Sequence, residues 1–166
     1  CLDENEFMVF GSGAAQEMHR RWFESHLDRF NVEYKNRSDE FHGISIAGPN
    51  SRKVLEKIVR DDVSNEKFRF RDSRRMFVGG VPAIINRISF TGELGYEVWC
   101  HPSDAPAVWD AIWVAGKSHD LAPLGPLSNN AGESPSSEHP KRTYVVDEPE
   151  KALDHGSTLN VDTVDS

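Results

Sequence analysis

The stretch RISFTGELGYEVW, at residues 87–99, decides most of what this sequence says about its fold. Residues 82–90 and 95–100 are rich in β-branched and aromatic side chains, which is typical of strands. Between them, Gly92 and Gly95 stand three positions apart and break the strand pattern. Because glycine tolerates sharp turns and close backbone approaches, we expect the chain to turn here and return as a second extended segment.

The expected turn gathers three chemically useful side chains, those of Phe90, Glu93 and Glu97. An aromatic ring can stack on a flat heterocycle, and a carboxylate can accept two N–H donors from the edge of the same ring. This combination predicts a binding site for a flat, nitrogen-rich ligand. Surface hairpins also often carry an aromatic residue and a glutamate, so the spacing alone leaves a purely structural role open.

The rest of residues 1–125 alternates between strand and helix patterns. Apolar runs closed by glycine or proline predict strands, and apolar residues at three- and four-residue steps predict helices. The expected strands are residues 6–10, 31–35, 43–47, 67–71 and 76–78, and the expected helices are residues 14–29, 50–60 and one that begins near residue 103. This order predicts an α+β domain, in which flanking helices cover a mixed or antiparallel sheet.

The expected helix at residues 14–29 has a clear apolar stripe, to which Ala15, Met18 and Trp22 belong. We expect this stripe to face the protein interior and the charged residues between its members to face water. Ser12 is a candidate N-cap for the helix.

A basic cluster follows in residues 67–75. Three of its members alternate within the expected strand at 67–71 and should share one face. Such charges form either a solvated surface or a patch that attracts an anionic ligand tail or an acidic partner. The cluster consists of Lys67, Arg69, Arg71, Arg74 and Arg75.

Composition narrows the functional class. The 166 residues carry a net charge of -8, which argues against general nucleic-acid binding, because that depends on Lys and Arg neutralising phosphates. Cys1 and Cys100 are too few for a disulfide framework, and neither cysteines nor histidines have the spacing of a metal site. No long apolar run or signal peptide pattern is present. We expect a cytoplasmic protein, or a mitochondrial matrix protein in a eukaryote, that binds no metal, membrane or nucleic acid.

Residues 126–166 differ from the rest of the chain. They hold eight acidic and three basic side chains, a balance of -5, and only one aromatic residue. Such a segment buries too little apolar surface to offset its ordering entropy. We therefore predict a domain at residues 1–125 and a polar, acidic, disordered tail at 126–166, with a short strand possible at 143–146.

At residues 87–97 the sequence resembles the glycine-cleavage T-protein (aminomethyltransferase) family. The resemblance is greatest to the tetrahydrofolate-binding domain of dimethylglycine and sarcosine dehydrogenases. The family motif R-x-S-[FY]-T-G-E-x-G-[YF]-E is matched from Arg87 to Glu97. Similar agreement extends over most of residues 1–125, at 6–8, 11–13, 19–22, 45–52 and 61–65.

The resemblance implies a role for each matched side chain. Glu97 corresponds to the carboxylate that accepts hydrogen bonds from the amino group and ring N–H of a pterin, and Phe90 to the aromatic residue that packs against the ligand. Glu93 and Gly95 shape the turn, and Arg87 supports the carboxylates. The implied cofactor is tetrahydrofolate, whereas FAD would belong to a separate upstream domain.

The resemblance also implies that this chain lacks two family features. The catalytic aspartate lies upstream of the first matched strand, and the nearby Asp3 does not correspond to it. After Gly125 the family continues into an arginine-containing helix and a small barrel, where this chain reads PLSNN at residues 126–130. We therefore expect no catalytic residue in this chain and no one-carbon transfer by the chain alone.

Three functions are compatible with these residues. The first is the tetrahydrofolate-binding part of an aminomethyltransferase-like domain, which passes one-carbon units from N-methylglycine-type amines to tetrahydrofolate. The second is a truncated, non-catalytic binding or subunit-contact module. The third keeps the fold but demethylates another methyl donor. Beside tetrahydrofolate, the expected partners are a second copy, through Trp109 and Trp113, or further domains.

Overall fold

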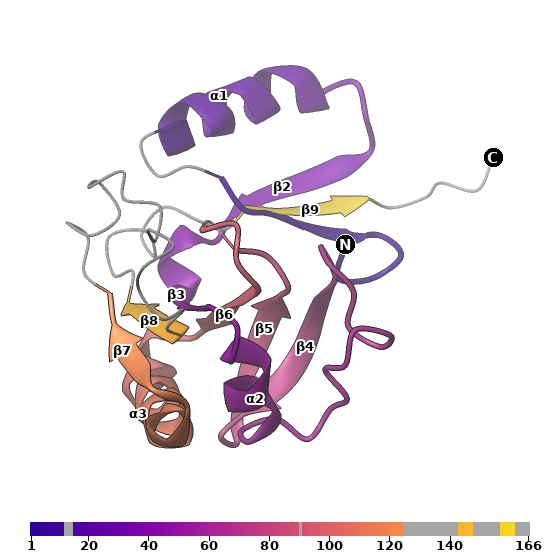
Figure 1. Cartoon of the computed structure of the whole chain (residues 1–166). Coiled ribbons are helices and arrows are strands. Elements are labelled where there is room, and N and C mark those ends of the chain that lie inside the picture. The colour runs from indigo at the N-terminus through magenta and orange to yellow at the C-terminus, as the bar shows by residue number, and fades with distance from the viewer. Residues whose placement is uncertain (12–14, 90, 125–142, 148–156, 162–166) are drawn as a thin grey trace. The chain divides into compact units, whose positions relative to one another are not determined.

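The computed structural model describes residues 1–11, 15–89, 91–124, 143–147 and 157–161 (Figure 1). The chain forms two compact units. The first comprises residues 1–42 and 149–166, and the second comprises residues 43–148. Each unit is described by itself.

The second unit is built on a six-stranded sheet with the strand order β4-β5-β6-β3-β8-β7. Its strands are β3 (His42–Ala47), β4 (Ser73–Val78), β5 (Val81–Asn86), β6 (Gly95–Cys100), β7 (Leu121–Pro123) and β8 (Thr143–Asp147). The strand β8 pairs antiparallel with β3 and parallel with β7, so the sheet is mixed.

A tight turn joins β4 to β5. Val78 and Val81 are paired across it, and both Gly79 and Gly80 have positive φ angles, 59° and 92°. Two consecutive positive φ angles define the hairpin turn whose twist matches that of the flanking strands. The two glycines therefore fix the register of this hairpin.

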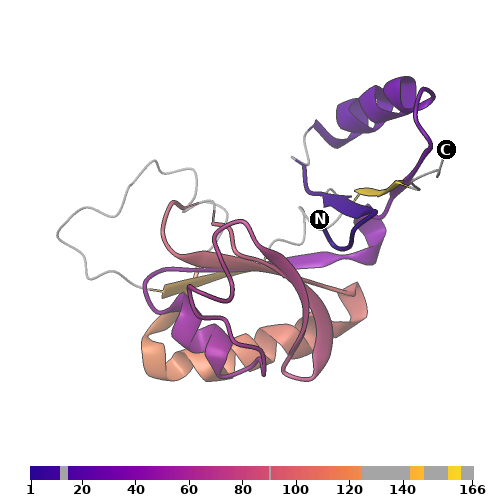
Figure 2. The ribbon, with the colours of Figure 1, turned by 90° about the vertical axis from the view of Figure 1, so that its right-hand side faces the viewer.

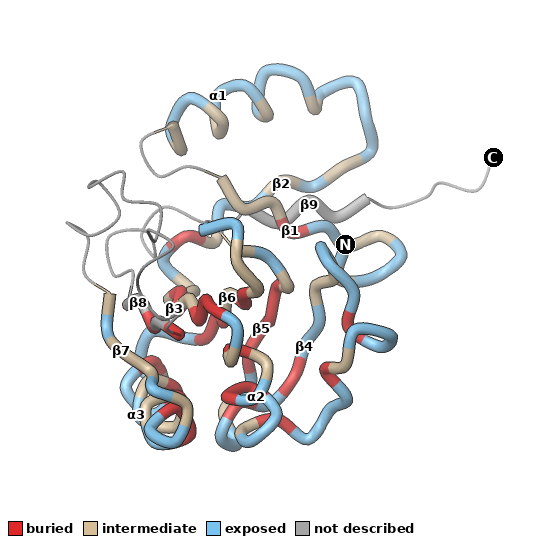
Figure 3. Tube along the Cα trace, viewed as in Figure 1, coloured by how far each residue is buried: buried red, intermediate tan, exposed pale blue. Residues whose placement is uncertain are grey.

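Alternate residues of a strand point to the same face of a sheet. In the central strands the residues that point to one face are apolar, so this face forms the core. The most buried of them, each at most 1% exposed, are Ile44, Ile46, Ile85, Tyr96 and Val98. Two helices, α2 (Ser51–Glu56) and α3 (Ala105–Gly116), pack on this face and complete the core. Figure 2 shows both helices on the same side of the sheet, and Figure 3 shows how the buried residues gather in these elements.

The helix α3 contributes Val108 and Ile112, which are both 0% exposed. Trp109 and Trp113, one turn apart, stack with ring centroids 6.3 Å apart. Ala107, between the buried positions Val108 and Ile112 and the start of the helix, is exposed. Short 3-10 helices occur at Ser38–Glu40, Pro102–Asp104 and Lys117–His119.

The first unit holds a three-stranded antiparallel sheet. Its strands β1 (Glu6–Val9) and β2 (Val32–Asn36) both pair with β9 (Ser157–Val161), which lies between them. The helix α1 (Gln16–Leu27) connects β1 to β2 along the chain. No helix in the described parts of the chain is long and apolar enough to cross a membrane.

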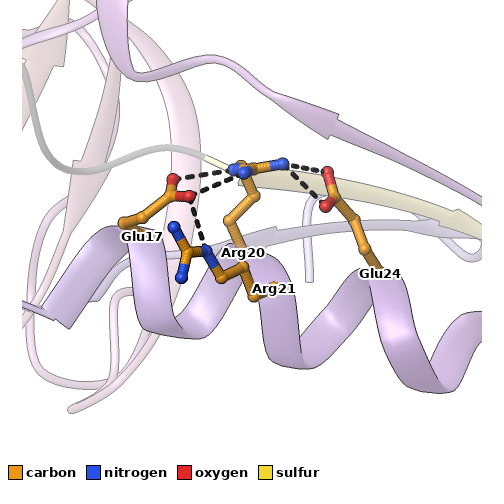
Figure 4. A network of polar contacts seen from close by, with 4 residues as sticks. All are labelled: Glu17, Arg20, Arg21 and Glu24. Atoms are coloured by element: carbon orange, nitrogen blue, oxygen red, sulfur yellow. Dashed lines mark hydrogen bonds and ion pairs between the residues drawn. The ribbon is translucent and has the colours of Figure 1, made fainter.

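Charge contacts, rather than burial, characterise α1. Arg20 forms ion pairs with Glu17 at 2.7 Å and with Glu24 at 2.6 Å, and Arg21 contacts Glu17 at 2.9 Å (Figure 4). Hydrogen bonds from Arg20 and Arg21 lower the pKa of Glu17 from 4.5 to about 2. None of the residues of α1 is buried.

The predicted α+β class, with a mixed sheet and flanking helices, is confirmed, and so are most of the expected elements. The inward stripe of α1 is wrong in this structure, because Met18 is 65% exposed and Trp22 is 56% exposed. The proposed N-cap Ser12 lies outside the described residues.

The strand expected at residues 67–71 does not form. Phe68 is buried and stacks on Tyr96, but its backbone N–H donates to Ser64 in a turn. Arg71 then has a φ of 71°, which interrupts an extended chain. The alternation in this segment therefore reflects one anchoring aromatic ring and not a strand, so the basic side chains do not share a strand face.

Within residues 126–166 the structure describes only β8 and β9. The strand β8 contains the short strand expected at residues 143–146. The other tail residues lie outside the described residues, and both the tail's disorder and the domain boundary at residue 125 stay predictions.

Candidate functional site

The candidate site is built on the hairpin of β5 and β6, which pair antiparallel with Asn86 opposite Glu97. In the connection between these strands, Gly92 has a φ of 77°. Gly95 has a different function, because a Cβ atom there would lie 2.6 Å from the Cβ of Ser89 and 3.0 Å from the carbonyl oxygen of Ile46. The first glycine allows the turn, and the second allows the connection to fold back against β6.

Glu97 points to the face of the sheet opposite α2 and α3, because its neighbours Tyr96 and Val98 belong to the helix-covered core. Its carboxylate is half-buried. The indole nitrogen Nε1 of Trp99 donates a hydrogen bond to Glu97 Oε2 at 3.4 Å. The carboxylate is thus held from within its own strand.

The ring of Trp99 packs against a glycine on the neighbouring strand. A Cβ atom at Gly43 would lie 2.8 Å from Cζ3 and 2.9 Å from Cη2 of the Trp99 ring. Only a residue without a side chain leaves this room. Trp99 is 3% exposed, so its position is set by packing.

A row of polar residues crosses the sheet at Glu97. Gly43 lies against Trp99, and Gly48 N–H donates to the Leu94 carbonyl at 2.8 Å, so β3 and β6 run in opposite directions. This places Ser45 beside Glu97 on the same face. On the other side of Glu97, the strand pairing brings Asn86 and then Ser73 into line. We call Ser45, Glu97, Asn86 and Ser73 the polar row.

Asn86 is oriented by its neighbour in the polar row. The Ser73 hydroxyl donates to Asn86 Oδ1 at 2.7 Å. Asn86 is 8% exposed, whereas the other three members are half-buried. The row therefore offers a carboxylate, an oriented amide and two hydroxyls along one line.

The structure places the sequence-predicted site residues unequally. Glu93 is half-buried in the connection, where its backbone N–H donates to Thr91 Oγ1 at 3.4 Å. Phe90 lies outside the described residues, so its expected proximity to Glu97 stays a prediction.

Arg87 has contacts different from those expected. Its guanidinium donates to the Phe68 carbonyl at 2.5 Å and to Asn65 Oδ1 at 2.6 Å. Its Nε is buried without a partner in the described part of the chain. Arg87 therefore supports the segment at residues 65–68, and among the described residues it makes no ion pair with Glu93 or Glu97.

Sequence reasoning singled out Glu97 but not its neighbours Ser45, Asn86 and Trp99. The period of two within a strand could have found Trp99, which must share a face with Glu97. Ser45 and Asn86 gave no such signal, because their position depends on which strands pair and in what register.

The arrangement is suited to forming hydrogen bonds with the polar edge of a flat heterocycle. A carboxylate accepts N–H donors, and hydroxyl and amide groups beside it supply donors and acceptors in the same line. Within the described residues, no group of three or more metal-ligating side chains is close enough to hold a metal ion. Fold and site together define an α+β domain with hydrogen-bonding groups on the face of its sheet opposite α2 and α3.

Comparison with known proteins identifies the family. The GCVT N-terminal domain family matches residues 1–131. The chain belongs to this family, a folate-binding domain shared by aminomethyltransferases and dimethylglycine dehydrogenases. The resemblance seen in the sequence motif is thereby confirmed.

Individual relatives are much longer than this chain. The chain is 36% identical over 129 residues to dimethylglycine dehydrogenase, mitochondrial, of Homo sapiens, covering 76% of this chain and 15% of that protein. It is 34% identical over 122 residues to an aminomethyltransferase of Clostridium botulinum, covering 74% of this chain and 33% of that protein. It is 40% identical over 100 residues to a trimethylamine-oxide aldolase of Ruegeria pomeroyi, covering 57% of this chain and 13% of that protein.

A solved structure, heterotetrameric sarcosine oxidase from Corynebacterium sp. U-96 in complex with pyrrole 2-carboxylate, matches 52% of this chain and 43% of that chain. The TM-score is 0.46 and the sequence identity is 17%. The family assignment rests on the sequence matches.

Proposed function

We propose that this chain binds tetrahydrofolate and forms the pterin-binding part of a domain for one-carbon transfer from N-methylglycine-type amines. The observation that carries the proposal is the position of Glu97. Its half-buried carboxylate lies in the middle of the polar row and is held by Trp99. The family membership supports the identity of the ligand.

In this proposal Glu97 accepts hydrogen bonds from the pterin amino group and ring N–H, and Phe90 packs against the ring. Glu93 shapes the connection, while Arg87 acts indirectly by holding residues 65–68 against the end of β5. When bound, tetrahydrofolate supplies the nitrogen that receives the one-carbon unit. The protein residues bind and orient it, which is the larger part of what positioning can contribute to such a reaction.

A methyl donor different from N-methylglycine-type amines is a specific alternative. The match to a trimethylamine-oxide aldolase favours a donor other than an N-methylglycine. This alternative changes the partner of tetrahydrofolate and leaves the proposed function of Glu97 unchanged. A non-catalytic contact module is the remaining candidate, and it predicts no tetrahydrofolate binding at all.

The test is calorimetric titration of the 166-residue chain with tetrahydrofolate under anaerobic conditions. A hydrogen bond to a charged group contributes about 1.5–3 kcal/mol, so Glu97→Gln should weaken binding roughly 10- to 100-fold. We expect the same preparation to show no one-carbon transfer from dimethylglycine or sarcosine.

The matched control is Glu56→Gln, an exposed position on α2, which covers the other face of the sheet. It removes the same charge and should leave the dissociation constant unchanged. Equal affinities of the wild type and Glu97→Gln, or no binding by the wild type, would overturn the proposal.

A further inference from the structure

Asn86 is an unusual member of the polar row, because it is more than nine-tenths buried but only half satisfied. Its Oδ1 accepts a hydrogen bond from Ser73 Oγ at 2.7 Å. In the part of the chain that the structure describes, its Nδ2 donates to no acceptor. Nδ2 is not among the buried side-chain atoms that lack a partner, so it is open to solvent and can donate to an acceptor that a ligand supplies.

The position of Asn86 relative to Glu97 indicates which group of the ligand would accept the hydrogen bond from Nδ2. The two residues are opposite each other in the β5–β6 pairing, and such pairs have Cβ atoms about 4.5–5.5 Å apart on one face. Along the pterin edge, the amino group and the ring N–H are followed by a carbonyl oxygen. Glu97 can accept from the first two groups but only repels the third.

We propose that Asn86 is a further ligand-binding residue, whose Nδ2 donates to the pterin carbonyl oxygen next to the N–H groups that Glu97 accepts. This inference rests on the proposed function, since it needs a pterin on the polar row. Glu97 and Asn86 together match the order donor, donor, acceptor along the pterin edge. Ser73 is a positioning residue, because its hydroxyl holds Oδ1 and so leaves Nδ2 for the ligand.

The polar row thereby sets specificity as well as affinity. A heterocycle with a carbonyl oxygen at this position meets a donor. If a heterocycle carries a second amino group in place of the carbonyl oxygen, this donor faces the Nδ2 donor of Asn86. Neither group then has an acceptor, and ligand binding leaves a buried polar group unpaired. The class of ligand selected is a fused pyrimidinone that carries an amino group, a ring N–H and a carbonyl oxygen in sequence.

Asn86→Asp tests this inference, because it keeps the size of the side chain and replaces the donor with an acceptor. Titration with tetrahydrofolate should show binding at least about 10-fold weaker than in the wild type, the loss expected for an unpaired and repelled carbonyl oxygen. Asn50→Asp is the charge-matched control. It adds the same charge at the N-cap position of α2, where the side chain of Asn50 makes no capping hydrogen bond that the substitution could break.

A second measurement does not require the variant to fold. In a 15N-labelled wild-type chain, the side-chain amide resonance of Asn86 should shift when tetrahydrofolate is added, because Nδ2 gains an acceptor. Ser73→Ala removes the hydroxyl that holds Oδ1, and it should weaken binding about 2- to 10-fold.

The outcomes separate the two proposals. If Glu97→Gln loses binding while Asn86→Asp binds as the wild type does, or the Asn86 resonance does not move, the function of Asn86 is overturned and the proposed function stands. If the wild type binds no tetrahydrofolate, both are overturned.

Discussion

The two faces of the six-stranded sheet use the same strands for different purposes. Ile85 and Asn86 are consecutive residues of β5, and both are buried. Ile85 packs into the core beneath α2 and α3, whereas Asn86 lies in the polar row on the opposite face. Burial therefore stabilises the fold on one face and orients hydrogen-bonding groups on the other.

The difference extends to how each face is packed. The helix-covered face is filled by large apolar side chains such as Tyr96 and Leu55. On the opposite face, Gly43 leaves room for Trp99, whose indole then holds Glu97. The packing of the first face requires large side chains that fill the core. The packing of the second face requires that Gly43 has no side chain, so that the Trp99 ring fits. The two faces should accordingly respond differently to substitution.

The largest expected effect is on the helix-covered face. Ile85→Ala should lower the free energy of unfolding by roughly 2–5 kcal/mol, because a fully buried side chain is replaced by a cavity. Urea unfolding followed by circular dichroism measures this change. Once corrected for the folded fraction, the affinity for tetrahydrofolate should equal that of the wild type. A large affinity loss in the folded variant would mean that the two faces are coupled.

Gly43→Ala should have a smaller effect on stability and a clear effect on the site. Its methyl group meets the Trp99 ring, so we expect a loss of about 1–3 kcal/mol in unfolding free energy and weaker tetrahydrofolate binding. Trp99→Phe removes Cη2 and Nε1. In the Trp99→Phe background, Gly43→Ala should therefore cost measurably less, which a double-mutant cycle by urea unfolding would show. Additive costs would contradict the packing of Trp99 on Gly43.

The smallest effect lies outside both faces, in the exposed ion pairs of α1. The pKa of Glu17 is lowered from 4.5 to about 2, so its contribution to stability is complete above pH 4.5 and is lost as the pH falls toward 2. Exposed pairs of this kind contribute little and are screened by salt. A carboxyl-carbon NMR titration should show the low midpoint for Glu17, and Arg20→Gln with Arg21→Gln should return it toward 4.5.

Local signals predicted the elements whose pattern does not depend on distant residues. Gly92 and Gly95 indicated the turn after β5 and the return into β6. The segment at residues 67–71 shows where such reasoning fails. Its alternating aromatic residues look like a strand, but Phe68 is anchored by stacking on Tyr96, which is distant in the sequence.

The helix α1 shows the opposite failure. Its apolar period correctly predicted a helix, but the periodicity could not say whether a partner surface covers Met18 and Trp22. Amphipathicity identifies a face that can be buried, and only packing decides whether it is.

The sequence by itself determined the α+β class, the hairpin of β5 and β6, the family, and Glu97 as the first candidate for a binding carboxylate, because these depend on local periodicity and on a contiguous motif. Only the tertiary structure decided that Ser45, Asn86 and Ser73 stand in line with Glu97. The physical reason is that strand register is set by the whole sheet, since a shift of one residue would turn every one of these side chains to the opposite face.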